Sequence, residues 1–136
     1  MPKLSSFLLF DGNCADAFTF YQSCLGGELT LLKVADSPVK DHMPPAAQNR
    51  IVYANLKGDG FDLSASDWLH PVRTPRPGNT VCLFITGGTF DESKVIFDQL
   101  SADADPTLLD PLQKSFFGFY GALTDKFGVR WMFKGD

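Results

Sequence analysis

The sequence predicts an α+β domain that contains two copies of a βαβββ module. The order strand, helix and three strands occurs twice along the chain, which is the pattern of an internal repeat. The two predicted helices begin near Cys14 and Phe90, an offset of 90 − 14 = 76 residues. A stretch rich in proline and glycine separates the copies. We therefore expect one domain, 1–136, made of modules at about 1–67 and 78–136.

The first module opens with an apolar strand at 4–10, followed by a helix. Asn13 is a suitable N-cap for this helix, and Gly26-Gly27 is a signal that ends it. A loop at 35–49, rich in turn-forming residues, is either a functional lid or a surface excursion. The remaining strands are expected at 28–34, 50–57 and 61–66, with a glycine-containing hairpin turn between the last two.

The second module repeats this order after an irregular segment at 67–78. Thr89 and Glu92 form a capping-box sequence, which predicts the start of a helix that runs to about residue 100. Its strands are expected at 79–86, weakly at 107–110, and then at 115–124 and 129–134.

Composition excludes several classes of partner. The chain carries 12 basic and 16 acidic residues, and its basic residues are scattered, which argues against nucleic acid. No apolar stretch approaches the roughly 20 residues of a membrane span, so we expect no membrane partner. The three cysteines include no CxxC pair, and together with the absence of a signal-peptide pattern they predict reduced thiols and a cytoplasmic protein.

Five local motifs are spread along the chain: Phe10-Asp11-Gly12-Asn13-Cys14, Ala17-Phe18-Thr19-Phe20-Tyr21, Gly26-Gly27-Glu28-Leu29, Ser64-Ala65-Ser66-Asp67 and the segment from Leu123 to Met132. Together they resemble the PhnB-like branch of the vicinal oxygen chelate superfamily, which includes glyoxalases, bleomycin-binding proteins and ring-cleaving dioxygenases. The resemblance implies two incomplete barrels around a cleft, a homodimer, and a small-molecule ligand.

Metal-dependent members of that superfamily place their ligands on the first and last strands of each module. Aligned through the helix and the final turn, those positions fall at Ser6 and Met132. The helix offset gives 6 + 76 = 82, which is Cys82. The final hairpin strands begin near Phe61 and Val129, an offset of 129 − 61 = 68, which gives 132 − 68 = 64, or Ser64. This set does not suit a hard divalent cation, so we expect no metal and no cofactor, and a divalent metal is disfavoured.

The candidate cleft therefore rests on side chains that suit an organic ligand. Tyr53 and Asn55 alternate with apolar neighbours, and Phe116, Phe117 and Tyr120 form an aromatic cluster in the predicted strand 115–124. Core or dimer packing would also explain that cluster. The expected cleft contains Ser6, Tyr53, Asn55, Ser64, Cys82, Phe116, Phe117, Tyr120 and Met132.

Other readings of the sequence stay open. His42 and His70 lie in proline-rich loops and could hold a metal together with Asp41 or Asp67, although loop histidines are more often solvated.

The expected function is binding of a small, partly apolar organic molecule without the usual metal site, and the reaction, if there is one, is unassigned. The alternatives are a metal-dependent lyase or isomerase of glyoxalase type and a structural or regulatory homodimer. Relatives of this branch are often labelled demethylubiquinone methyltransferases, but the chain has no glycine-rich fingerprint for a nucleotide cofactor.

Overall fold

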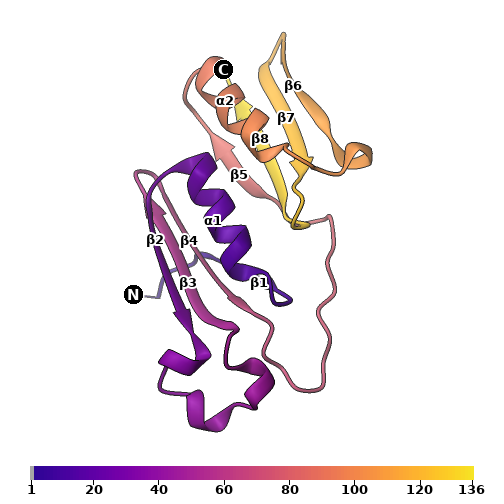
Figure 1. Ribbon diagram of the computed structural model, residues 1–136. Helices are drawn as coiled ribbons and strands as arrows, with labels where there is room; N and C mark the ends of the chain where they lie inside the picture. Colours follow the sequence, from indigo (N-terminus) through magenta and orange to yellow (C-terminus); the bar gives the residue numbers. More distant parts are fainter. Residues whose placement is uncertain (1) are drawn as a thin grey trace. The chain divides into compact units, whose positions relative to one another are not determined.

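A computed structural model describes residues 2–136, which divide into two compact units with the boundary between Pro75 and Arg76. Each unit contains one βαβββ module, in agreement with the predicted order and with the predicted α+β class (Figure 1). Within the part of the chain that is described, no helix is long and apolar enough to cross a membrane.

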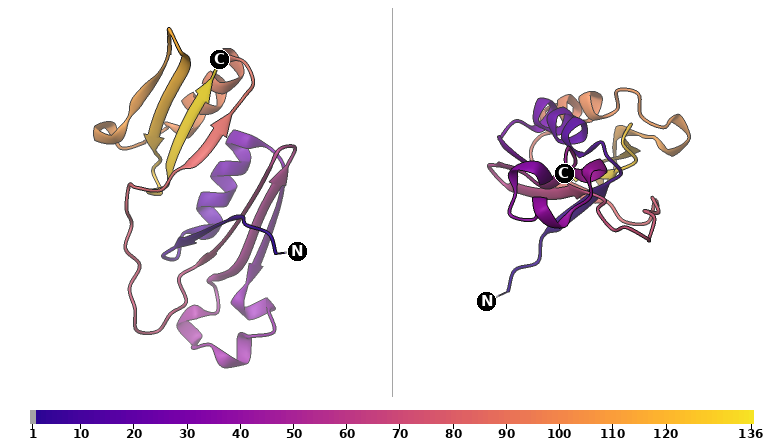
Figure 2. Two further views of the ribbon diagram at one scale, coloured as in Figure 1. Left: turned by 180° about the vertical axis from the view of Figure 1, so that it is seen from behind. Right: turned by 60° about the horizontal axis from the view of Figure 1, so that its bottom comes forward.

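Unit 1 is a four-stranded sheet with one helix. Its sheet has the order β1-β4-β3-β2, with β1 parallel to β4 and the other neighbours antiparallel. The helix covers one face of the sheet and leaves the opposite face without a helix, as Figures 1 and 2 show. The elements are β1 (Ser6–Phe10), α1 (Cys14–Leu25), β2 (Glu28–Lys33), β3 (Ile51–Gly58) and β4 (Phe61–Asp67).

The core of unit 1 lies between α1 and the sheet. Phe18 and Tyr21 of α1 are fully buried, as are Ala54 and Leu56 of β3. Phe18 also contacts Phe10 of β1 edge to face, with ring centroids 6.2 Å apart, so the apolar side of the helix packs on the sheet.

The start of α1 is capped differently from the sequence expectation. Asn13 occupies the N-cap position, but its side chain makes no capping hydrogen bond. Instead, the buried carboxylate of Asp67 accepts hydrogen bonds from the backbone N–H groups of Gly12 (3.0 Å), Cys14 (2.9 Å) and Ile51 (2.8 Å). Asp67 thus ties the end of β4 to the start of α1 and the start of β3.

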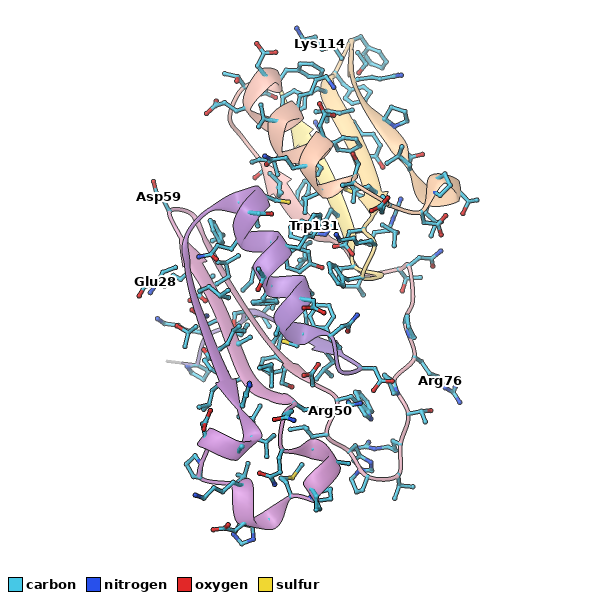
Figure 3. All side chains as sticks on the ribbon, in the orientation of Figure 1. Glu28, Arg50, Asp59, Arg76, Lys114 and Trp131 are labelled. Atoms are coloured by element: carbon cyan, nitrogen blue, oxygen red, sulfur yellow. The ribbon has the colours of Figure 1, made fainter. Side chains whose placement is uncertain are left out.

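The loop between β2 and β3 is organised by three short 3-10 helices, η1 (Val34–Asp36), η2 (Lys40–His42) and η3 (Pro45–Ala47). Arg50 lies where this loop joins β3 (Figure 3). Its guanidinium donates to the Asp11 carboxylate at 3.0 Å and to the Trp68 carbonyl at 2.8 Å. The loop is therefore fastened to the segments that follow β1 and β4.

Unit 2 repeats the arrangement with the sheet order β5-β8-β7-β6, in which β5 is parallel to β8. Its helix covers one face of the sheet, and neither sheet closes on itself. The predicted Thr89–Glu92 capping box is confirmed, with both reciprocal hydrogen bonds present. The elements are β5 (Leu83–Thr86), α2 (Phe90–Leu100), η4 (Pro106–Leu108), β6 (Asp110–Ser115), β7 (Gly118–Thr124) and β8 (Arg130–Gly135).

Three strand predictions in unit 2 were wrong. The strand expected weakly at 107–110 begins only at Asp110, after the 3-10 helix η4. The strand expected at 79–86 is shorter, and Cys82 precedes β5 rather than lying in it. The long strand expected at 115–124 is a hairpin in which β6 ends at Ser115, with Phe116 and Phe117 in the turn. Gly118 explains the turn, because its φ is +117° and a β-carbon there would collide with the carbonyl oxygen of Gly135.

Candidate functional site

The helix-free face of the unit 1 sheet displays apolar side chains on its parallel strand. We call the helix-free face of each sheet its open face. Phe7 pairs with Ser64 and Leu9 pairs with Ser66 across β1 and β4. Leu63 and Ala65, which alternate with these serines, are buried on the helix side. Phe7 is 53% exposed and Leu9 is 52% exposed, so both side chains are available on the open face.

A polar cluster lies on the same face beside this apolar strip. Asn55 pairs with Ser64 across β3 and β4. Its Nδ2 donates to Asp62 Oδ1 at 2.6 Å and to Ser64 Oγ at 3.2 Å. Tyr53, two residues earlier on β3, is 41% exposed. The open face of unit 1 therefore combines aromatic surface with a fixed set of hydrogen-bonding groups.

The open face of unit 2 has the same organisation. Phe84 of β5 pairs with Met132 of β8, which in turn pairs with Ala122 of β7. Trp131 and Phe133, which alternate with Met132, are buried, and Phe133 packs edge to face on Phe97 of α2. Phe84 is 57% exposed. Each open face thus carries one exposed phenylalanine on its parallel first strand.

Arg130 marks one end of the open face of unit 2. Its Nη1 donates to the Leu108 carbonyl at 2.6 Å and to Thr124 Oγ1 at 3.3 Å. Its Nη2 lies 3.7 Å from a carboxylate oxygen of Asp110 on the edge strand. These contacts hold the guanidinium in place between η4 and the sheet, which is a structural use of its charge.

Five of the predicted site residues lie on the open faces of their own units. Tyr53, Asn55 and Ser64 lie on that of unit 1, and Tyr120 and Met132 on that of unit 2. Ser6 does not share a face with Ser64, because it pairs with Leu63, which is buried toward α1. The expectation that Ser6 and Ser64 point the same way was therefore wrong by one residue.

Phe7 and Phe84 are the residues that sequence reasoning missed on the first strands. The side chains from Phe7 to Phe10 and from Leu83 to Ile85 are all apolar, so alternation in the sequence could not show which of them face the helix. The offset of 76 was measured between helix starts, and it does not transfer to the strands, whose faces are set by the parallel pairing.

The remaining predicted residues lie at the margins of unit 2. Cys82 is half-buried and precedes β5. Phe116 is fully exposed at the tip of the β6–β7 hairpin, where its ring meets that of Phe117 edge to face at 5.3 Å. Lys134 Nζ lies 5.4 Å from the centroid of the Phe117 ring.

The central residue pairs of the parallel strands do not fit a hard divalent cation. The central pairs of the parallel strands are Phe7 with Ser64 and Phe84 with Met132, which offer one hydroxyl and one thioether. Such donors suit neither the carboxylate-rich nor the imidazole-rich sites that Mg²⁺, Mn²⁺ and Zn²⁺ require. Within residues 2–136 no group of three His, Cys, Asp or Glu side chains is placed to hold an ion.

The cysteines do not supply a nucleophile in unit 1. Cys14 is fully buried at the start of α1, and burial together with the nearby Asp67 carboxylate raises the pKa of its thiol to about 12. Because the thiolate is the reactive form, a thiol with this pKa is inert at neutral pH. Cys24 is also buried.

His42 and His70 line one groove of unit 1, with a volume of about 660 Å³, but the carboxylates expected to join them do not. Asp67 is engaged by three backbone N–H groups, and Asp41 does not line the groove. Arg50 and Trp68 line it instead, and sequence reasoning singled out neither residue.

Two βαβββ modules with open four-stranded sheets give the chain the glyoxalase/bleomycin resistance type of fold. Within it, the chain belongs to the PhnB-like family whose model is described as 3-demethylubiquinone-9 3-methyltransferase and matches residues 2–133. The predicted resemblance is thus confirmed.

Relatives of the chain match it over nearly its whole length. The protein YjdN of Escherichia coli K12 is 34% identical over 143 residues, which cover 97% of this chain and 93% of YjdN. The crystal structure of PA1353 from Pseudomonas aeruginosa is similar with a TM-score of 0.85 and 29% identity, and covers 100% of this chain and 98% of PA1353. The structure of a PhnB protein from Bacillus cereus is similar with a TM-score of 0.75 and 22% identity, and the match covers 99% of this chain and 100% of that protein.

Proposed function

We propose that this chain binds a small, partly apolar organic molecule on the open faces of its sheets, and that it does so without a metal ion. The observation that carries the proposal is the pairing of an exposed phenylalanine with a non-ionisable side chain at the centre of each face, Phe7 with Ser64 and Phe84 with Met132. Aromatic surface of this kind favours a flat ligand through stacking and burial of apolar area.

The polar cluster of unit 1 supports a ligand that carries one or two hydrogen-bonding groups. Asn55 Nδ2 is directed to Asp62 and Ser64, which leaves the amide oxygen of Asn55 as an acceptor and the Ser64 hydroxyl as a donor. A ligand N–H or O–H group could donate to the Asn55 amide oxygen, and a ligand carbonyl could accept from the Ser64 hydroxyl. This pattern discriminates against pure hydrocarbons, because they would leave these groups without partners.

The proposal assigns no reaction to the chain. The family description names a methyltransferase, which would need a site for a methyl donor, and the sequence has no glycine-rich strand–loop–helix motif of that kind. A metal-dependent lyase or isomerase would need three or more nitrogen or oxygen ligands, and the open-face pairs do not offer them.

The proposal is tested by a thermal-shift screen of aromatic and heteroaromatic metabolites against chelator-treated protein. A ligand that binds the native state raises the melting temperature, and the rise grows with the logarithm of its concentration relative to its dissociation constant. The variants Phe7→Ala and Phe84→Ala remove exposed side chains and should fold normally, yet they should abolish the shift. Val95→Ala, an exposed apolar residue on α2, is the matched control and should leave it unchanged.

Three outcomes would overturn the proposal. A shift that survives both phenylalanine substitutions would place the ligand elsewhere. A shift that appears only when a divalent metal is restored would favour the metal-dependent alternative, and if no compound stabilises the protein, a structural or regulatory role is favoured instead.

A further inference from the structure

Unit 1 contains a concave site at the end of its sheet, away from Phe7, Tyr53, Asn55 and Ser64. This groove has a volume of about 660 Å³ and lies between the loop of 3-10 helices and the segment that follows β4. All its lining residues belong to unit 1, and none of them is Phe7, Tyr53, Asn55 or Ser64. Figure 3 shows Arg50 at this junction. We refer to it as the Arg50 groove.

The Arg50 groove has the opposite charge balance to the whole chain. Its lining includes Arg50 and Arg73 but only one carboxylate, that of Asp11. Two cationic side chains against one anionic side chain leave an excess of one positive charge, whereas the formal net charge of the chain is -4. A surplus cation in a concave site attracts an anion.

Arg50 is held in one orientation by its contacts. Its Nη1 donates to the Asp11 carboxylate at 3.0 Å and to the Trp68 carbonyl at 2.8 Å. Within the described residues, its Nη2 and Nε hydrogens have no protein acceptor. The side chain is partly buried, so the guanidinium is ordered before any ligand arrives, and these donors form a fork suited to a carboxylate.

The segment after β4 gives the groove an aromatic wall. Trp68 is half-buried, and its indole N–H donates to the Arg73 carbonyl at 2.6 Å. His70 Nδ1 accepts hydrogen bonds from the backbone N–H groups of Val72 at 3.1 Å and Arg73 at 2.8 Å. These bonds order the turn that places Arg73 at the groove, and Met43 and Leu69 add apolar surface.

We propose that the Arg50 groove binds a small aromatic carboxylate, with the carboxylate on Arg50 and Arg73 and the ring against Trp68. The proposal goes beyond binding on the open faces and does not depend on it, since the two sites share none of the residues used in either argument. The rival explanation is that Arg50 serves only as a structural tie between Asp11 and Trp68. Substitution of Arg73 distinguishes the ligand-binding role from the structural one. The Arg73 side chain is exposed and forms no hydrogen bond or ion pair among residues 2–136, so it has no structural tie to lose.

The test uses 2-naphthoate as the probe and the neutral 2-naphthamide as its isostere, titrated into the ¹⁵N-labelled full chain. Naphthoate should shift the indole N–H signal of Trp68, assigned with Trp68→Phe, while the amide should bind much more weakly. Arg73→Gln should weaken naphthoate binding by about threefold or more, as expected for loss of one partly exposed charge pair. Arg76→Gln lies in the same irregular segment but outside the groove, and should leave binding unchanged.

Other results would overturn the proposal. Equal binding of naphthamide, or unchanged naphthoate binding in Arg73→Gln, would show that the groove does not recognise the anion. If naphthoate shifts the ¹⁵N–H signals of unit 2 and not that of the Trp68 indole, the probe binds elsewhere. Phe7→Ala should not affect naphthoate binding in the groove, so failure of this proposal and failure of open-face binding can be told apart.

Discussion

Asp67 is expected to be among the most costly side chains to remove from unit 1, because it satisfies three backbone donors in a buried position. Its carboxylate accepts from Gly12 at 3.0 Å, Cys14 at 2.9 Å and Ile51 at 2.8 Å. A hydrogen bond to a charged group contributes about 1.5 kcal/mol or more, so Asp67→Ala should lower the free energy of unfolding by about 4–5 kcal/mol. Asp67→Asn keeps one oxygen, and should cost about 2 kcal/mol through one lost bond and weaker helix capping.

Urea denaturation followed by circular dichroism measures both changes. Asp62→Ala is the matched control, since Asp62 lies on the same strand but is exposed, and the change should stay within about 0.5 kcal/mol. A loss below about 1.5 kcal/mol for Asp67→Ala, or a loss as large for Asp62→Ala, would refute the role assigned to Asp67.

Three further outcomes are expected. In native protein at pH 8, a thiol reagent should modify Cys82 and not Cys14, because burial raises the pKa of the Cys14 thiol. Mass spectrometry locates the adduct. Modification of Cys14 at the same rate as Cys82 would contradict the burial of Cys14. Thr89→Ala should destabilise unit 2 by about 1 kcal/mol through loss of the cap bond to Glu92, and hydrogen exchange that stays unchanged in the first turn of α2 would contradict this. The chain should form a homodimer, which light scattering measures. A mass equal to that of a single chain at micromolar concentration would contradict this prediction.

Features set by neighbouring residues were predictable from the sequence. The βαβββ order follows from local hydrophobic periodicity and breakers, and the Thr89–Glu92 capping box is complete within four residues. The cap of α1 was not predictable, because Asp67 lies 53 residues from Cys14 and reaches it only through the parallel pairing of β1 with β4.

The candidate site was predictable only in part, for the same physical reason. Alternation along β3 placed Tyr53 and Asn55 on one face correctly, since their polarity differs from that of their neighbours. On the first strand Ser6 is followed only by apolar side chains, so the register with β4 is what assigns Phe7 and Ser6 to opposite faces, and no local signal encodes that register. The Arg50 groove joins two irregular segments, so no periodicity could reveal it.

The central claim, metal-free binding on the open faces, is tested most directly by one calorimetric titration. A ligand found in the thermal-shift screen is titrated into protein dialysed against chelator, with the metal content of the same sample measured by mass spectrometry. The account predicts full binding at negligible metal content, and loss of binding in Phe7→Ala and Phe84→Ala. Binding that requires a stoichiometric divalent metal, and that both substitutions leave intact, would contradict it.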